Sequence, residues 1–499
     1  MIVIIFFTKK FESIDYQLFK IICVNIVSSP ISPNFVAQPS LTMEKTLLWE
    51  AYSSFSTAEM REFDKFVRSP FFNSRPQLVE LMEEMSACKA KGAVPTRPES
   101  SSVEERLCHS ALLTLLEKYL IFTEKFTDPE RGKIRLAAAY RKRNLGKHFQ
   151  KTLREARKSR DKQPWRHADY YHDLNLIEWE QYQYDTTVHR TESLNIQATS
   201  DLMDQAFIAR KLRLACLAVS HQAVYKTEYK IGLMEAVLEH VAVENLSEMP
   251  AIGLYFHCYH FLTAAFETGE KHFARFREML AACATTFPPE ELRTLYLLAI
   301  NFGIKKLNES REGWLRITFD LYKSALELDL LLENNQISRF AFNNITAIAL
   351  RVDELDWAEN FILSYRPKLE RQWRDATASL NMARVAYARK DYKTALLNLQ
   401  RSDYKDLINN LIAKTLQLKI YYETDEFDLL ASHLASMKNF IRRHTAIGYH
   451  RTNYSLLVQY TQQMSTLNFS NAKAVAEFRE KVEKEKVLTE KAWFLEMLG

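Results

Sequence analysis

Glycine and proline are scarce in this 499-residue chain, which holds 10 glycines and 13 prolines. Average usage would be about 7% and about 5%. Both residues interrupt helices, because glycine loosens the backbone and proline removes a hydrogen-bond donor. Few prolines follow Pro164, and no stretch sustains the alternating pattern of a strand. The sequence therefore predicts an all-α fold of long helices joined by short corners.

The glycines also lie far apart from one another. Phosphate-binding loops, dinucleotide-binding turns and nucleophile elbows all need closely spaced glycines, so the sequence has none of them. His257 and His260 lie three residues apart on one helix face and could both bind a metal ion. No third ligand is evident nearby, so we prefer core or groove histidines. We predict a chain that is not an enzyme and that has no cofactor and no metal site.

Closely spaced cysteines are missing too. The six cysteines are scattered singly, without the C-x-x-C pairs that metal and redox sites use. We expect reduced thiols buried in the core, where cysteine behaves as a small apolar residue. Reduced thiols suit a cytoplasmic protein.

Long hydrophobic runs are absent as well. Residues 1–42 contain short apolar runs, but none reaches the roughly 18 residues that a membrane helix needs. Lys9 and Lys10 follow the first apolar run, whereas a secretory signal has its positive charge before it. Our hypothesis is that Met43 is the true start and that residues 1–42 are not native or are disordered. A short membrane anchor is the alternative.

The clearest positive pattern is an aromatic residue that recurs every thirty-five residues, at Tyr322, Trp357, Tyr392 and Phe427. Around Tyr392 the sequence predicts two helices that meet at a tight corner at Lys390 and Asp391. One such hairpin cannot bury its apolar face alone, so consecutive hairpins stack. The period therefore indicates an array of helical repeats.

The segment from about 306 to 445 resembles degenerate tetratricopeptide repeats, with Ala383 on the first helix, Asp391-Tyr392 at the corner and Ala395 three residues later. The resemblance implies a right-handed α-solenoid of helical hairpins, whose first helices line a concave groove for a peptide or a helix. The implied groove positions are Asn381, Arg384, Tyr387, Thr415, Lys419 and Tyr422. Arg384 and Lys419 are thirty-five residues apart, which favours an acidic ligand.

A second motif lies near the N-terminus. Ser56 and Glu59 form a capping box that begins a helix with Phe63, Phe66 and Val67 on one face. The text FxxFVxSPFFN, residues 63–73, resembles the opening motif of a family of bacterial helical proteins with no assigned activity. The resemblance implies a fold and no chemistry. For the paired phenylalanines at 71 and 72 we prefer staples that close a helix corner, and a partner-binding knob is the alternative.

Residues 131–166 are strongly basic, with fourteen lysines and arginines against two acidic residues, whereas the whole chain has a net charge of +5. The basic side chains at helical spacing on one face are Lys147, Lys151, Arg154 and Lys158. Such a stripe could contact the phosphates of a nucleic acid. It lacks the interleaved aromatics of single-strand binders, so a solvated or internally paired face is the preferred interpretation.

These patterns divide the chain into six parts. They are a first segment of uncertain origin (1–42), a helical hairpin (43–90), a Gly-, Pro- and Ser-rich linker (91–102), a helical segment that holds the basic stretch (103–199), a repeat array (200–469) and a capping helix (470–499). The capping helix is predicted to run unbroken from 470 to 498. We expect a cytoplasmic protein-interaction scaffold with a protein or peptide partner and no membrane. Binding of nucleic acid or another polyanion through 131–166 is the alternative.

Overall fold

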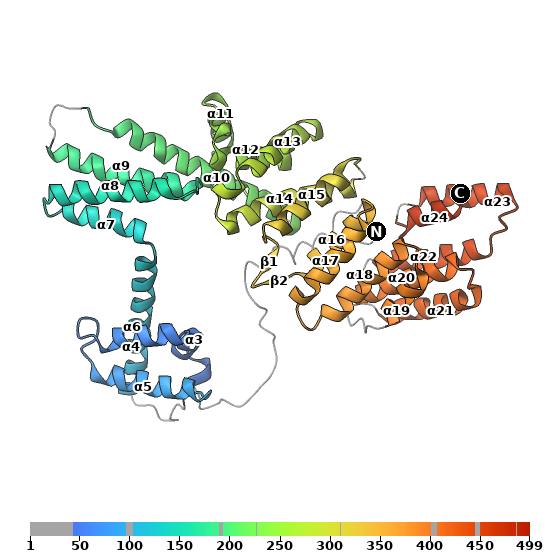
Figure 1. Ribbon diagram of the computed structural model, residues 1–499, viewed down its shortest axis with the longest axis horizontal. Helices are drawn as coiled ribbons and strands as arrows, with labels where there is room; N and C mark the ends of the chain where they lie inside the picture. Colours follow the sequence, from blue (N-terminus) through green and yellow to red (C-terminus); the bar gives the residue numbers. More distant parts are fainter. Residues whose placement is uncertain are drawn as a thin grey trace. The chain divides into compact units, whose positions relative to one another are not determined.

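The computed structural model describes residues 43–95, 103–188, 193–225, 227–309, 311–400, 407–444, 450–485 and 487–499. The expectations for residues 1–42 and for most of the linker at 91–102 lie outside these ranges. The described part is built from helices, and its strands are the two-residue β1 (Leu332–Glu333) and β2 (Gln336–Ile337), which pair antiparallel (Figure 1). The predicted all-α class is confirmed. Among the described residues, no helix combines the length and apolar composition that a membrane span needs.

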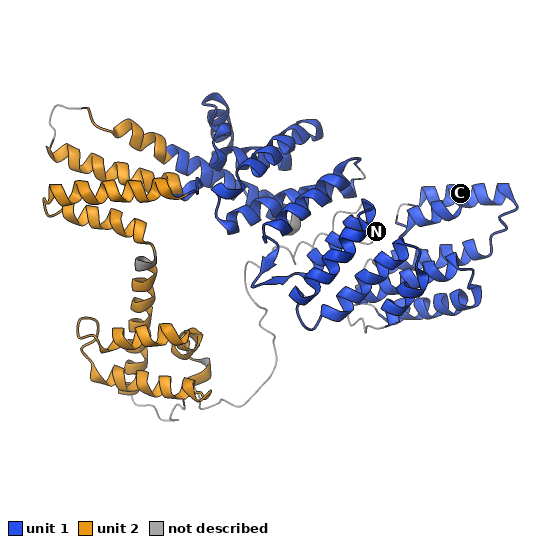
Figure 2. Cartoon of the chain, in the orientation of Figure 1, with its two compact units in different colours: residues 1–28, 164–169, 204–499 blue, residues 29–163, 170–203 orange. Residues whose placement is uncertain are grey.

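The chain forms two compact units (Figure 2). Of the described residues, unit 2 holds 43–163 and 170–203, and unit 1 holds 164–169 and 204–499. Unit 2 contains η2 (Met43–Lys45), α3 (Leu47–Ser54), α4 (Thr57–Arg68), α5 (Pro76–Ala90), α6 (Val103–Thr127), α7 (Pro129–Arg141), α8 (Gly146–Lys162), most of α9 (Ala168–Val188) and the start of α10 (Ile196–Tyr225).

The predicted N-terminal motif forms the first core of unit 2. The Ser56 hydroxyl accepts a hydrogen bond from the Glu59 N–H, and the Glu59 carboxylate accepts one from the Ser56 N–H, which confirms the capping box. The three apolar residues of the motif on α4 are buried. The Phe72 ring stacks on that of Phe66 with centroids 4.0 Å apart, but Phe71 is 87% exposed. The staple interpretation is therefore correct for Phe72 and wrong for Phe71.

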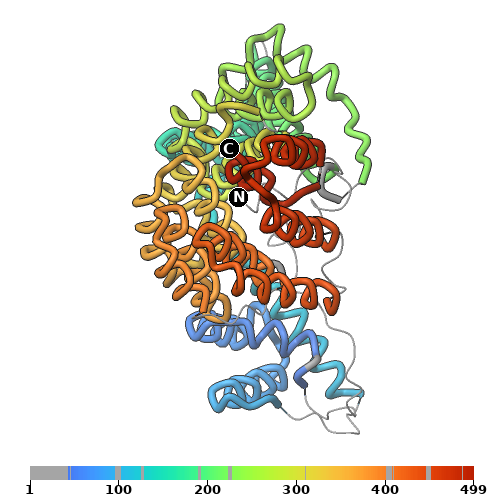
Figure 3. Tube along the Cα trace, turned by 90° about the vertical axis from the view of Figure 1, so that its right-hand side faces the viewer, coloured from blue at the N-terminus to red at the C-terminus, as the bar shows by residue number. Residues whose placement is uncertain are grey.

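Unit 1 continues with η3 (Leu246–Glu248), η4 (Ala284–Thr286), η5 (Arg366–Lys368), α11 (Met234–Val243), α12 (Pro250–Thr263), α13 (Phe266–Ala282), α14 (Pro289–Asn308), α15 (Trp314–Glu327), α16 (Arg339–Arg351), α17 (Leu355–Tyr365), α18 (Arg374–Ala388), α19 (Tyr392–Gln400), α20 (Leu407–Glu423), α21 (Phe427–Arg443), α22 (His450–Ser465), α23 (Ala472–Lys484) and α24 (Lys491–Met497). From α14 to α22 each helix packs on the next, and α18 also packs on both α16 and α20. Figure 3 shows the succession from yellow to orange-red in a second view.

One corner geometry recurs along this array. Asp353, Lys390 and Asp425 have left-handed φ angles of 62°, 60° and 56°. In each corner the next N–H bonds back to the carbonyl five residues earlier, for example Asp391 N–H to Ala386 O at 2.9 Å. This bond ends a helix and reverses the chain. It joins α16 to α17, α18 to α19 and α20 to α21.

The thirty-five-residue aromatic spacing matches these corners only in part. Tyr392 and Phe427 are the first residues of α19 and α21, and Trp357 lies in the first turn of α17. Tyr322 instead lies well inside α15, and the corner before that helix is at Gly313, with φ 78°. Tyr322 is therefore a buried core residue inside α15, and it does not stand at a helix corner as the other three aromatic residues do.

The predicted unbroken helix from 470 to 498 is also wrong. The chain leaves α23 after Lys484, and Glu490, with φ 61°, precedes the seven-residue α24. Val482, Trp493 and Phe494 are all buried in the core that α18, α20, α21 and α22 share. The break lets both short helices turn their apolar sides to this core.

Candidate interaction surfaces

The six predicted groove residues come from two adjacent helices. One turn apart on α18 lie Asn381, Arg384 and Tyr387, and α20 carries Thr415, Lys419 and Tyr422. Four of the six are buried, and the two tyrosines are half-buried. The structure brings the six residues onto neighbouring helices, as the thirty-five-residue register predicts. It does not leave them open, so the expectation of a free groove at these positions is corrected.

Polar neighbours cover the α18 positions. The side-chain amide of Asn381 donates to Asn343 Oδ1 on α16 at 2.6 Å and to the Thr377 carbonyl at 2.8 Å. Arg384 Nη1 donates in turn to Asn381 Oδ1 at 3.1 Å. A buried polar group without a partner would destabilise the fold, and these bonds remove that penalty. Asn381 and Arg384 are therefore part of the packing between α16 and α18.

The chain's own C-terminal segment covers the α20 positions. Lys419 Nζ forms an ion pair with Glu490 Oε2 at 3.0 Å, and these residues are only 7% and 2% exposed. The ammonium group lies 4.6 Å from the ring centroid of Tyr387 and 5.7 Å from that of Trp493. The Trp493 ring also meets Tyr422 edge-on at 5.4 Å. Lys419 therefore has an acidic partner within the chain, seventy-one residues away, and an acidic ligand from another protein stays a prediction.

Glu423, the last residue of α20, completes this site as a shared hydrogen-bond acceptor. Its carboxylate accepts bonds from Trp493 Nε1–H at 2.7 Å, from the Tyr392 hydroxyl at 2.7 Å and from the Tyr387 hydroxyl. Burial raises the pKa of Tyr387, and the hydrogen bond to Glu423 raises it further. The same two causes raise the pKa of Tyr392 to about 12. Both tyrosines thus remain donors to Glu423.

The sequence patterns did not point to Glu423, nor to Glu490 and Trp493, which contact Lys419 and Glu423 from the C-terminal segment. A buried lysine needs a nearby carboxylate, so Lys419 did signal an acid, but its identity depends on how the C-terminus folds back. We name the site formed by Tyr387, Lys419, Tyr422 and Glu423 the α20 site.

The predicted basic stripe lies on α8 in unit 2. Lys147, Lys151, Arg154 and Lys158 are all exposed, and none forms an ion pair with any residue in the described ranges. The helix rises by about 1.5 Å per residue, so the four charges extend over roughly 17 Å of one face. They form a solvated cationic strip.

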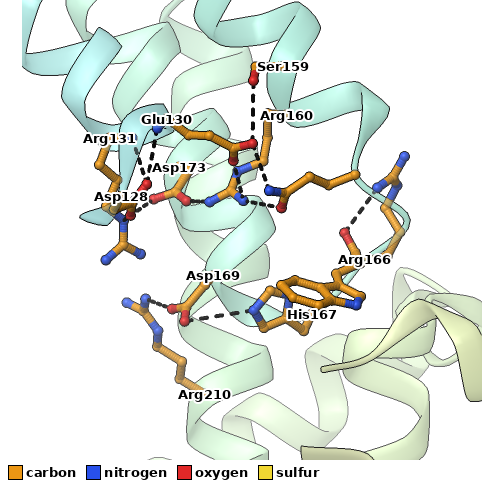
Figure 4. Close-up of polar contacts among 12 residues, drawn as sticks. Asp128, Glu130, Arg131, Ser159, Arg160, Arg166, His167, Asp169, Asp173 and Arg210 are labelled. Atoms are coloured by element: carbon orange, nitrogen blue, oxygen red, sulfur yellow. Dashed lines mark hydrogen bonds and ion pairs between the residues drawn. The ribbon is translucent and has the colours of Figure 1, made fainter. Parts of the chain in front are cut away.

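Other basic residues of 131–166 are paired with α9. Arg131 Nε bonds to Asp173 Oδ1 at 2.9 Å, and Arg141 Nε bonds to Glu180 Oε2 at 2.8 Å (Figure 4 draws the first). Arg160 contacts Asp173, which is 1% exposed, and its Nη1 lies 3.0 Å from Glu130 Oε2. These pairs join α7, α8 and α9, and among their members Arg160 and Asp173 are buried. The basic stretch thus has one internally paired face and one face in water.

Figure 4 also shows a separate polar group in unit 1, where Arg210 Nη2 lies 2.5 Å from Asp169 Oδ1 and His167 Nε2 lies 3.8 Å from Asp169 Oδ2. These contacts link the start of α9 to the middle of α10, and we assign them no chemical role.

The two predicted histidines meet a third one. His272 of α13 lies with its Nδ1 2.8 Å from His257 Nδ1, and its ring stacks on that of His260 with centroids 4.3 Å apart. Burial first, and then the charge of His272, lowers the pKa of His257 and of His260 to about 4. Within the described ranges, no three or more His, Cys, Asp and Glu residues are arranged to hold a metal ion. The histidines are a neutral cluster between α12 and α13.

Comparisons with known proteins give no family for this chain. No protein-family model matches it, and neither does any curated protein or solved structure.

Proposed function

We propose that this chain is a non-enzymatic cytoplasmic scaffold that binds a peptide or a helix of a partner protein. In this proposal the hairpins from α14 to α22 form a right-handed solenoid of tetratricopeptide-like repeats, and α16, α18 and α20 are its first helices. The packing of α18 on both α16 and α20 supports this arrangement. The single observation that carries the proposal is that the C-terminal segment already packs on α20, with Glu490 paired to Lys419 and Trp493 of α24 bonded to Glu423.

The side chains of the α20 site explain why this face suits binding. The Lys419 ammonium group beside the Tyr387 ring and the Glu423 carboxylate present a defined pattern of charge and hydrogen bonds. Such a pattern confers specificity more than affinity, because complementary charges exclude wrong partners. Lys419 is buried, with 7% of its surface exposed, and burial strengthens its polar contacts.

Affinity capture of the full chain from the source cell tests the proposal. Wild type, Lys419→Glu and the control Lys158→Glu are compared, and each lysate is split into nuclease-treated and untreated halves. We expect a specific protein that survives nuclease, is lost with Lys419→Glu, and is unchanged with Lys158→Glu. Identical partners for all three proteins would contradict binding at the α20 site.

The second candidate function is binding of a polyanion, such as duplex nucleic acid, by α8. The observation that favours it is the set of four exposed basic residues with no ion pair to the described residues. Each phosphate contact contributes about −0.9 to the slope of log K against log salt concentration, so four contacts predict a slope of about −4 on B-DNA.

A filter-binding titration of the full chain with a duplex oligonucleotide at several salt concentrations measures this slope. Reversal of all four charges to Glu should abolish binding, and reversal of the exposed Lys473 on α23 should have little effect. Equal losses from both variants would indicate nonspecific attraction to a basic protein, and that result would exclude α8 as the site.

A further inference from the structure

We infer that residues 487–499 are an exchangeable occupant of the α20 site and that the scaffold's partner presents the same chemistry. That chemistry is a short helix with a glutamate just before it and a tryptophan three residues after the glutamate. The inference rests on the proposed function, and it adds the chemical class of the ligand and its control by the chain's own C-terminus.

The α20 site has one requirement for charge and one for hydrogen bonding. Lys419 Nζ, between the Tyr387 and Trp493 rings, needs a carboxylate, which Glu490 supplies. The Glu423 carboxylate needs N–H or O–H donors, and the indole N–H of Trp493 is one of them. A partner that replaced this segment would have to supply both groups, because a buried charge left without a partner is strongly unfavourable.

The spacing of the two groups adds a geometric condition. Glu490 precedes α24 and Trp493 is its third residue, so both groups reach α20 from the first turn of one helix. Phe494, the next residue, is fully buried and meets Tyr460 of α22 with ring centroids 6.1 Å apart. A ligand with the pattern Glu-x-x-Trp-Phe at the start of a helix would satisfy all these contacts.

Several features indicate that the segment can leave. Glu490 is a non-glycine residue with φ 61°, a conformation that is unfavourable unless its surroundings impose it. Helix α24 has seven residues, and isolated helices of that length are not stable in water. The ion pair contributes little net stability over an apolar pair of similar shape, whereas it does specify the occupant. Leu488, Trp493, Phe494 and Leu498 lie in the shared core, so the segment leaves through a local opening that exposes them.

Tethering explains how such a site stays closed without a partner. A segment joined by a short connection has an effective concentration on the order of millimolar. A partner at lower concentration displaces it only when its own affinity is higher or when the segment is weakened. The C-terminus therefore acts as an internal competitor that sets the affinity threshold for binding.

A peptide with the sequence of residues 487–499 tests the inference directly. The dye-labelled peptide is titrated into the full chain by fluorescence anisotropy, with wild type, Trp493→Ala and Glu490→Gln as receptors. Both substitutions weaken the internal segment and leave the α20 site unchanged. We expect the peptide to bind the Trp493→Ala chain about tenfold or more tightly than wild type, because the internal segment leaves the site open in a larger fraction of the chains. Equal affinity for all three receptors would overturn the inference.

A charge exchange identifies the site of peptide binding. A peptide with Glu490→Lys should not bind the Trp493→Ala chain, and it should regain affinity for a chain that carries both Lys419→Glu and Trp493→Ala. Failure of this exchange would show that the peptide binds elsewhere. It would leave the scaffold proposal standing, because partner capture tests that proposal with natural ligands.

Hydrogen exchange of the unmodified chain gives a measurement that needs no variant. Amides of α24 should exchange at least about tenfold faster than those in the centre of α20, through local opening. Exchange of both helices at the same slow rate would show that the segment leaves only when the unit unfolds, and it would exclude an exchangeable occupant.

Discussion

The ion pair between Lys419 and Glu490 predicts a strong energetic coupling between α20 and the C-terminal segment. Replacing Lys419 by Met leaves the Glu490 carboxylate buried and without its cation, and removal of one member of a buried pair costs about 3–5 kcal/mol. Replacing Glu490 by Met leaves the ammonium between two aromatic rings, at 4.6 Å and 5.7 Å. Those rings compensate part of the loss, so we expect about 3 kcal/mol for this variant.

The double substitution should be far less harmful than the sum. Two methionines of similar length would place an apolar contact where the ions were, and such replacements are often neutral. The expected coupling energy is therefore about 3 kcal/mol or more, at or above the upper end for residues in contact. The informative result is that the double variant loses less stability than the sum of the two single variants, since independent sites would give additive losses.

Hydrogen exchange of α24 and α20 amides is the suitable assay, because a chain with two units does not unfold in one step. It reports the free energy of local opening at these helices. Lys481→Met on α23 is the control, since Lys481 is exposed and lies 5.1 Å from the Tyr460 ring, and we expect a change within about 0.5 kcal/mol. Losses that add to within about 0.5 kcal/mol would refute the buried pair.

Two further predictions concern α12 and α13. A Cβ on Gly253 would overlap the Ser247 carbonyl oxygen, so Gly253→Ala should destabilise unit 1 by about 1–3 kcal/mol in urea unfolding. Gly269, also the fourth residue of its helix, is the control, because a Cβ there would lie 3.5 Å from the nearest atom, Phe261 O, and its replacement by Ala should be neutral or stabilising. The same neutral or stabilising result for Gly253→Ala would contradict this packing. The pKa values of about 4 for His257 and His260 lie below the ordinary 6.5, so the unfolded chain binds more protons between those values and stability should fall as pH drops from 6.5 to 4. Thermal unfolding across this window checks it, and a double His→Gln variant with the same pH dependence would assign the effect elsewhere.

The repeat corners show what local sequence can predict. Lys390 and Asp391 read as a corner because the helical pattern stops there and a new one begins, and the structure has a left-handed residue at that point. The evenly spaced aromatics were a weaker guide. Tyr322 has the right spacing but lies inside α15, because burial in a core and packing at a corner both favour an aromatic residue.

The basic stretch shows the same limit in electrostatics. Helical spacing alone places Lys147 and Lys158 on one face, since that face depends only on 3.6 residues per turn. Which other basic residues are neutralised depends on α9, whose Asp173 lies forty-two residues after Arg131. Sequence periodicity contains no information about which distant helix packs against α8.

The C-terminus is the case in which tertiary packing overrides local propensity. Residues 481–491 are rich in lysine and glutamate, which are good helix formers, so an unbroken helix was the natural prediction. A straight helix through Glu490 would carry Trp493 and Phe494 away from α20 and α22 and expose two large rings to water. Burial of an aromatic side chain outweighs the modest propensity of a few helical residues, so α23 ends at Lys484 and α24 begins after Glu490. The break that buries these rings also brings the Glu490 carboxylate to Lys419, so one local departure from helix creates the occupant of the α20 site.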